Sequence, residues 1–216
     1  MLDIKCFQCN MLQENCYVVS DATKEAVVVD CGAYFDHERQ AIASYIRSEG
    51  LTLRHVLCTH GHFDHAFGVD MLYDEFGVKP ELHAADAQFI TNFDQQCIDL
   101  LGEPYGRTMP SVGHFLSDGE DISFGTHLLT VRHTPGHSPG SVIFCCADED
   151  VAFTGDTLFL MSVGRSDLPH GSWMLLMSSL KQVIARLPKS MQVYPGHGPA
   201  TLIGNELKMN PYLRGF

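Results

Sequence analysis

The stretch "LCTHGHFDHAFG", residues 57–68, follows an apolar run and holds three histidines and one aspartate within six residues: His60, His62, Asp64 and His65. In an extended or loosely turned segment alternate side chains face one side, so His60, His62 and Asp64 can converge while His65 starts a new direction. Imidazole and carboxylate together suit zinc, iron or manganese, and thiolates, the usual ligands of structural zinc, are missing from the cluster. The segment therefore predicts a catalytic metal site, with a solvated polar loop as the alternative.

The run before this cluster, "LTLRHVLC" at 51–58, is typical of a buried strand. Its carboxyl end delivers the histidines to a loop, where open α/β sheets usually place their chemistry. Apolar and β-branched runs predict further strands at 15–21, 24–32, 81–83, 127–134, 140–148, 150–156 and 191–197. Helices are expected from an N-cap at Asp36 to Gly50, in stretches between Val69 and about Gln96, and from Ser172 to Pro188 with a buried apolar stripe from Trp173 to Leu187.

Three more candidate ligands lie downstream: His137 in "HTPGHSPGS", Asp156 in "FTGDTLF" and His197 in "YPGHGPA". Each follows a strand-like run and stands beside glycine, which lets the backbone turn tightly and expose a side chain at a sheet edge. With the first cluster they supply five histidines and two aspartates at four strand ends. That set is large enough for two metal ions that share one carboxylate.

Length and composition restrict the other possibilities. The 216 residues, 45% of them hydrophobic, predict one domain spanning 1–216, and no window approaches the roughly 18 apolar residues of a membrane span. Twenty-six acidic against 14 basic residues give a net charge of -12, which disfavours nucleic acid as a partner. The first residues lack the hydrophobic centre of a secretory signal, so we expect a cytoplasmic protein whose eight cysteines are reduced, with Cys6 and Cys9 in a strand.

The segments "THGHFDH", "TPGHSPGS", "TGDTLF", "GRSD" and "PGHG", in this order and spacing, resemble the metallo-β-lactamase fold hydrolases, and most closely their glyoxalase II-like (hydroxyacylglutathione hydrolase-like) branch. The resemblance runs along nearly the whole chain. It implies an α/β (α+β) fold, a four-layer αββα sandwich with the metals at one edge between the sheets. Only 19 residues follow His197, so we expect a relative that lacks the C-terminal helical domain of glyoxalase II.

The resemblance also implies the ligand sets. His60, His62 and His137 would hold one metal, Asp64, His65 and His197 the other, and Asp156 would bridge both. The expected cofactors are two divalent metal ions, zinc first, with iron or manganese as alternatives.

Two such cations can share a hydroxide, lower its pKa towards neutrality and polarise a carbonyl group. Asp64, besides binding metal, could accept a proton from the bridging water. A thiolate leaving group needs little protonation, which favours a small thioester, or a related ester, as the substrate. Arg165 in "GRSD" could clamp a substrate carboxylate or could pair with Asp167.

Other functions remain open. A mononuclear iron persulfide dioxygenase would leave Asp64, His65 and His197 less occupied, whereas a β-lactamase should be exported and an RNA-processing nuclease should be basic. From a different class, the chain could be a non-catalytic metal-binding or redox-sensing module that uses its thiols. Thr59 and Ser138 are interpreted as hydrogen-bonding loop residues, and packed or surface positions are expected for His37, His55, His83, His114, His127, His133 and His170.

Overall fold

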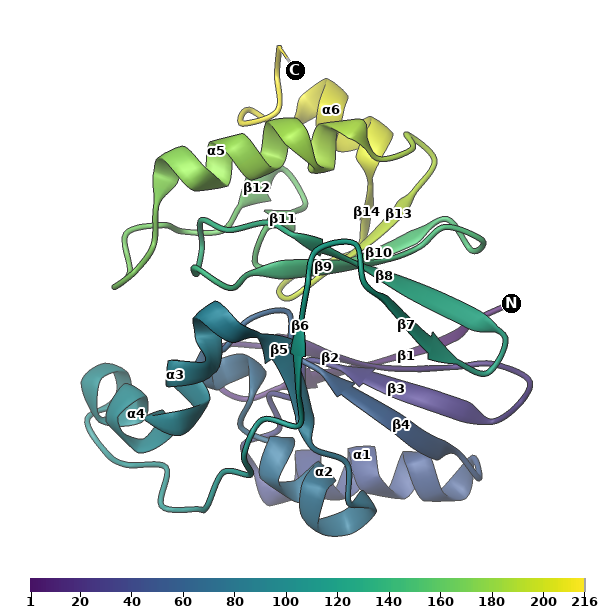
Figure 1. Cartoon of the computed structure of the whole chain (residues 1–216), viewed down its shortest axis with the longest axis vertical. Coiled ribbons are helices and arrows are strands. Elements are labelled where there is room, and N and C mark those ends of the chain that lie inside the picture. Colours follow the sequence, from purple (N-terminus) through teal and green to yellow (C-terminus); the bar gives the residue numbers. More distant parts are fainter. Residues whose placement is uncertain (216) are drawn as a thin grey trace.

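The computed structural model describes residues 1–215, in which two six-stranded sheets face each other (Figure 1). The first sheet has the strand order β1-β2-β3-β4-β5-β6, with bounds Asp3–Cys9, Glu14–Ser20, Glu25–Val29, Thr52–Leu57, Pro80–His83 and His114–Leu116. The second has the order β14-β13-β10-β9-β8-β7, with bounds Thr201–Leu202, Gln192–Pro195, Val151–Gly155, Val142–Cys146, His127–His133 and Asp121–Phe124. Strands β11 (Leu158–Phe159) and β12 (Ser162–Val163) form a small separate hairpin.

Helices cover the outer faces of both sheets (Figure 1). On the side of the first sheet lie α1 (Asp36–Ser48), α2 (Val69–Phe76), α3 (Ala87–Thr91) and α4 (Phe93–Leu101), and on the side of the second lie α5 (Trp173–Gln182) and α6 (Ile203–Met209). Short 3-10 helices are η1 (Phe63–His65), η2 (Ala84–Asp86) and η3 (Ile184–Arg186). The predicted four-layer αββα sandwich is therefore confirmed.

Three apolar layers hold this sandwich together, and strand alternation assigns side chains to them. In β3, Val27 and Val29 pack between the two sheets, whereas Val28 points to the helices that cover the first sheet. In β9, Cys146 joins the layer between the sheets and Cys145 the layer beneath α5 and α6, as expected for neighbours on one strand. Each central strand is thus buried on both faces, which explains its continuous apolar sequence.

The start of α1 differs from the prediction that Asp36 caps it. Phe35 occupies the cap position, and Asp36 is the first helical residue. The Glu38 carboxylate does the capping, since it accepts hydrogen bonds from the amides of Tyr34 (2.9 Å) and Phe35 (3.1 Å). Asp36 lies in the first turn instead, where a negative charge is favourable beside the positive helix end.

The helix predicted from Ser172 to Pro188 is shorter in the structure. Helix α5 ends at Gln182, and a separate 3-10 turn, η3, takes the chain towards Pro188. Leu176, Leu180 and Ile184 are fully buried, so this part of the predicted stripe is core. Trp173, in contrast, is 50% exposed. Its ring contacts the ring of Tyr212, with centroids 5.7 Å apart, so the first turn of α5 packs against the end of the chain.

Two further predictions concern the environment of the chain. Within residues 1–215 no helix is both long and apolar enough to cross a membrane. All eight cysteines are free thiols, as predicted, and only Cys6 is exposed. Cys6 lies within β1 and Cys9 is its last residue, as expected.

Candidate metal centre

Four strand ends meet at one edge of the sandwich and bring the seven predicted ligands together. The segment with His60 to His65 follows β4 of the first sheet. The second sheet supplies the others: His137 lies between β8 and β9, Asp156 directly follows β10, and His197 follows β13. The centre is thus built by both sheets, and its geometry depends on their packing.

Two glycines make the close approach of these loops possible. A Cβ atom on Gly196 would lie 2.5 Å from Asp156 Oδ1 and 2.5 Å from His65 Cε1. Gly155 has φ 46°, a left-handed conformation, and a Cβ there would collide with the Thr59 side chain. Any larger residue at either position would force apart the loops that carry the ligands.

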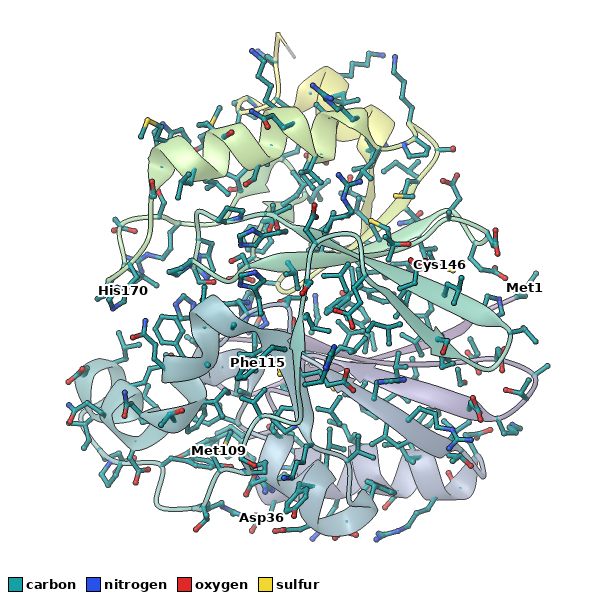
Figure 2. The ribbon with its side chains drawn as sticks, in the orientation of Figure 1. Met1, Asp36, Met109, Phe115, Cys146 and His170 are labelled. Carbon is teal, nitrogen blue, oxygen red and sulfur yellow. The ribbon has the colours of Figure 1, made fainter. Side chains whose placement is uncertain are left out.

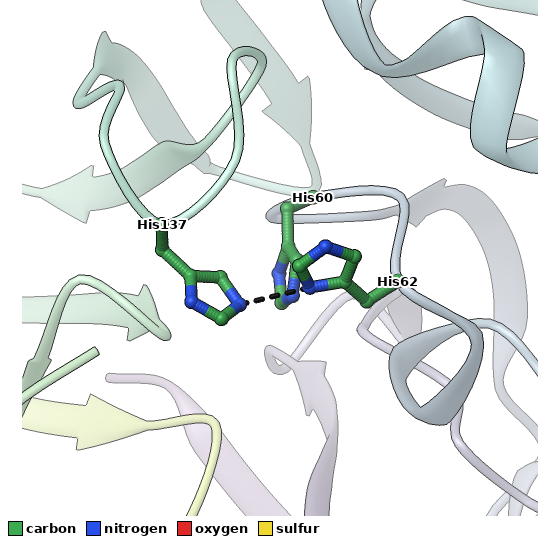
Figure 3. A group of neighbouring side chains, drawn as sticks. All are labelled: His60, His62 and His137. Atoms are coloured by element: carbon green, nitrogen blue, oxygen red, sulfur yellow. Dashed lines mark hydrogen bonds between the residues drawn. The ribbon is translucent and has the colours of Figure 1, made fainter. Parts of the chain in front are cut away.

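His60, His62 and His137 form the first group, with their rings turned towards one another (Figure 3). His62 Nδ1 lies 2.9 Å from His137 Nε2, and the His60 ring centroid is 4.7 Å from that of either neighbour. His60 Nε2 is buried and has no hydrogen-bond partner. The three imidazoles therefore present lone pairs to one small, enclosed space.

Asp64, His65 and His197 form the second group. Asp64 Oδ2 lies 3.7 Å from His65 Nε2 and 3.3 Å from His197 Nε2, and these two nitrogens are 3.3 Å apart. His65 is fully buried, whereas the His197 side chain is 26% exposed. Solvent or a substrate can therefore approach this group from the side of His197.

Asp156 lies between the two groups. Its Oδ2 is 3.5 Å from His137 Nε2 in the first group, and its Oδ1 is 3.3 Å from His65 Nε2 in the second. Oδ1 is buried without a hydrogen-bond partner. One carboxylate thus offers an oxygen to each group, which is the arrangement needed of a bridging ligand.

The donor atoms fit a pair of metal ions. Around a tetrahedral ion with bonds of about 2.0–2.1 Å, neighbouring donors lie about 3.3 Å apart. The distance from His62 to His137 and those among Asp64, His65 and His197 range from 2.9 Å to 3.7 Å and scatter about this value, and the donor atoms of each group lie within 4.8 Å of one another. Buried polar atoms normally have partners, and a metal would supply one for both His60 Nε2 and Asp156 Oδ1.

The electrostatics of the two groups differ. Burial and the neighbouring imidazoles hold the pKa of His60 well below its usual value, and burial with His137 lowers the pKa of His62 to about 3. Burial acts in the same direction on His65, but Asp156, Asp64 and Asp30 outweigh it and raise the pKa of His65 well above normal. His60 and His62 are therefore neutral imidazoles, the form that binds metal, whereas the second group attracts positive charge.

Asp30 supports the second group, and the sequence reasoning missed it. Its carboxylate accepts hydrogen bonds from the Thr59 amide (2.7 Å), the Thr59 hydroxyl (2.8 Å) and His65 Nδ1 (2.9 Å). This contact leaves His65 Nε2 facing the centre. The signal was present, since Asp30 in "VVVDCG" follows a strand and precedes a glycine by two positions, much like the predicted ligands.

Asp86 and Gln96 support the loops of the first group. Asp86 accepts hydrogen bonds from the amides of Gly61 (3.0 Å) and Gly140 (2.6 Å) and from the Ser138 hydroxyl (2.6 Å), so it joins both loops. Gln96 accepts from the amide of Phe63 (2.9 Å). No local pattern marks either residue. Ser138, like Thr59, is a hydrogen-bonding loop residue, as predicted.

Arg165 adopts the second of its two predicted arrangements. Its guanidinium donates two hydrogen bonds to Asp167, at 2.8 Å and 2.9 Å, and its side chain is 62% exposed. The backbone carbonyl of Arg165 accepts a hydrogen bond from His137 Nδ1 (2.7 Å) and thereby orients that ring. The clamping of a substrate carboxylate stays a prediction, with no contact that supports it.

The remaining histidines lie outside the centre, as predicted. His127 pairs with Asp21 (3.0 Å), His55 pairs with Glu81 (2.7 Å), and His83 stacks on His133 with ring centroids 4.2 Å apart. His114 and His37 are exposed. His170 is also exposed, but it lines a cavity that reaches His62 and is therefore nearer to the centre than expected.

Residues 9–197, which include all seven candidate ligands, match the family model described as the metallo-beta-lactamase superfamily. The chain belongs to this superfamily. Its members typically bind divalent metals, which agrees with the histidine-rich groups above.

Three relatives cover nearly the whole chain. Hydroxyacylglutathione hydrolase GloC of Haemophilus influenzae is 32% identical over 98% of this chain and 98% of its own. The crystal structure of the BLEG-1 B3 metallo-beta-lactamase superposes with a TM-score of 0.88 at 36% identity, over 99% of this chain and 100% of its own. TTHA1623, solved in a di-iron-bound form, gives 0.85 at 34% identity, over 97% and 100%. These likenesses confirm the predicted fold.

Proposed function

We propose that the chain is a hydrolase that uses two divalent metal ions to cleave a small thioester. The observation that carries the proposal is Asp156, whose two oxygens face two separate groups of donors within one buried centre. In this proposal His60, His62 and His137 would hold one ion, Asp64, His65 and His197 would hold the other, and Asp156 would supply an oxygen to each. Zinc suits the nitrogen-rich donor set, with iron or manganese as alternatives.

Bound at this place, such a pair of ions lowers the pKa of water and polarises a carbonyl group. The residues of the chain keep the ligands in the required state. His65 donates its Nδ1–H to Asp30, and His137 donates its Nδ1–H to the carbonyl of Arg165. The Nε2 atom of each ring therefore keeps its lone pair for a metal. Asp64 stays ionised, because although burial opposes its charge, His65 and His197 lower its pKa. Asp64 can therefore orient water or accept its proton.

The choice of a thioester follows from the leaving group. A thiolate departs without a proton, whereas the amine released from an amide or a β-lactam needs a general acid. In the proposed centre the seven titratable groups serve as metal ligands. This favours a substrate whose leaving group needs no proton from them. The name of the Haemophilus relative, a hydroxyacylglutathione hydrolase, supports the same substrate class. The BLEG-1 relative makes β-lactam cleavage an outcome that the assay must include.

A thiol-based sensor is less well supported. Reactive cysteines are exposed and have lowered pKa values, but seven of the eight cysteines here are buried. Burial raises the pKa of Cys16 and of Cys58 well above normal, so both stay protonated and inert at neutral pH.

The test is to load the purified chain with zinc, iron or manganese and to measure thiol release from S-lactoylglutathione and from other acyl thioesters. A β-lactam and an oxygen electrode provide the competing readouts. We expect thiol release that a chelator abolishes and added metal restores. Asp156→Asn should lower kcat/KM by more than about a hundredfold, the scale of a lost essential ligand, whereas Asp74→Asn, on the exposed face of α2, should not.

A chain with two bound metals that cleaves none of the thioesters would overturn the proposal. Oxygen uptake with one iron per chain would favour a dioxygenase instead, and cleavage of the β-lactam alone would favour a lactamase.

A further inference from the structure

A cavity of about 210 Å³ opens beside the first ligand group, and His62 forms part of its wall. One side is lined by Gln88 and Phe89 of α3, by Asn92 between the helices and by Gln95 of α4, and residues 168–170 line the other side. Figure 2 shows His170 on the loop before α5, on the side of the molecule where α3 and α4 lie. The cavity thus reaches one ligand of the first group, His62, from solvent.

The lining of this cavity is rich in amides and poor in positive charge. Gln88, Asn92, Gln95 and Gln96 line it, and among its lining residues neither lysine nor arginine occurs. Its one acidic residue, Asp99, accepts a hydrogen bond of 2.7 Å from Gln95. Gln96 is engaged with the backbone of Gly61, Phe63 and Phe89, which leaves Gln88 and Asn92 as the amides that can match the N–H and the C=O of an amide in a ligand. A ligand carboxylate would meet Asp99 here without a lysine or arginine to balance it.

The part of the cavity next to the centre is apolar. The Phe89 ring lies edge-on to the His62 ring with centroids 5.1 Å apart, and it also contacts His170 at 6.0 Å. Phe89 therefore separates the amide-lined part from the ligand group. An arm that crosses this position needs a short aliphatic stretch before its first polar group.

The opposite side of the centre has different chemistry. The Leu12 carbonyl accepts a hydrogen bond from His197 Nδ1 (3.1 Å), which places the β1–β2 turn beside this ligand, and the Leu12 side chain is 48% exposed. The Phe159 ring lies 6.1 Å from the His197 ring. Apolar side chains thus flank His197, whereas amides flank His62, so the two halves of a thioester would meet different surroundings.

We propose that the amide-lined cavity binds the thiol-derived arm of the substrate and selects an uncharged arm with amide groups over an arm that carries carboxylates. The inference rests on the proposed thioesterase function and adds the substrate class. The acyl group then lies on the side of Leu12 and Phe159.

The experiment compares one acyl group on three thiols in the metal-loaded chain. Pantetheine is uncharged and has two amides, glutathione has two carboxylates and one ammonium, and glutathione diethyl ester keeps the ammonium but has both carboxylates masked. At low ionic strength we expect kcat/KM for the pantetheine thioester to exceed that for the glutathione thioester at least about tenfold, the effect of one charge-sensitive contact. The diester should recover most of the difference, and added salt should reduce it.

A pair of matched variants tests the location. Asp99→Lys places a cation in the cavity and should raise the ratio of glutathione to pantetheine activity about tenfold. Asp148→Lys makes the same change of charge at an exposed turn and should leave the ratio unchanged. This turn directly follows Cys146, which lies far from His170 in Figure 2.

The outcomes separate the two proposals. Cleavage of the glutathione thioester as fast as the pantetheine thioester, or an equal effect of both lysine variants, would overturn the assignment of the cavity and leave the thioesterase function standing. Cleavage of none of the three would overturn the thioesterase function and this assignment with it.

Discussion

Replacing Asp30 by asparagine tests whether the second ligand group holds its own metal. The wild-type carboxylate accepts three hydrogen bonds, two from Thr59 and one from His65 Nδ1. Asparagine has the same shape but only one acceptor oxygen. If that oxygen accepts from the Thr59 amide, the NH2 group of the asparagine faces His65 Nδ1. His65 Nδ1 must then accept a hydrogen bond from this NH2 group, so the proton of the neutral His65 ring moves to Nε2. That proton occupies the atom that points to Asp64 and His197.

The size of the effect follows from this tautomer change. Loss of a residue that orients a metal-bound histidine weakens metal affinity about 10- to 100-fold, or about 1.4–2.7 kcal/mol. We expect this loss at the group of Asp64, His65 and His197. The group of His60, His62 and His137 reaches Asp30 only through the Thr59 hydroxyl, whose oxygen lies 3.1 Å from His60 Nδ1. This indirect link should cost that group less, within a factor of about three in affinity.

The assay is a competition titration with a chromophoric zinc chelator, which resolves two binding steps in the wild-type chain. Asp30→Asn should weaken one step and spare the other. Asp21→Asn is the matched control, because Asp21 is also a buried aspartate that accepts from a threonine and a histidine, but it does so away from the centre. Equal weakening of both steps in Asp30→Asn, or of neither, would refute the assignment of His65 to a separate metal.

Three further changes test other parts of the structure. Gln96→Leu removes the acceptor of the Phe63 amide and should lower metal affinity about tenfold, whereas Gln96→Glu, which keeps an acceptor, should lower it less; equal affinities would contradict the role of Gln96. Asp70→Ala leaves Arg39 buried without its partner at 2.7 Å and should reduce the free energy of unfolding in urea by about 3–5 kcal/mol; a loss below about 1 kcal/mol would count against a buried pair. Burial opposes the charge of Asp21, but hydrogen bonds from two threonines and a histidine hold its pKa below normal, so the ionised carboxylate stabilises the fold above about pH 5 and this effect fades as the pH falls. The urea midpoint of Asp21→Asn should therefore approach that of the wild type in acid. A gap between the two midpoints that stays constant with pH would contradict this.

The candidate ligands could be predicted from the sequence because each belongs to a local pattern. All four of His60, His137, Asp156 and His197 follow an apolar run and stand beside or near glycine. Because each run predicts a strand, these residues are expected at strand ends, which meet at one edge of the sheets. The same pattern marks Asp30, and attention to every strand end would have found it. The layer assignment of Cys145 and Cys146 follows equally directly from strand alternation.

What the sequence could not provide depends on contacts between distant segments. Asp86 joins the loop of Gly61, 25 residues earlier in the sequence, to the loop of Gly140, 54 residues later, so its hydrogen bonds exist only in the folded chain. The partner of Trp173 is Tyr212, near the end of the chain, and helical periodicity alone assigned that tryptophan to the core. The cavity beside His62 likewise arises where α3 and α4 meet the loop before α5.

Anomalous diffraction from crystals of the zinc-loaded chain, recorded on both sides of the zinc edge, tests the central claim most directly. The account predicts two zinc peaks about 3.5–4 Å apart, one bonded to His60, His62 and His137, the other to Asp64, His65 and His197, with Asp156 bonded to both. A single peak at full zinc saturation, or peaks away from these residues, would contradict it.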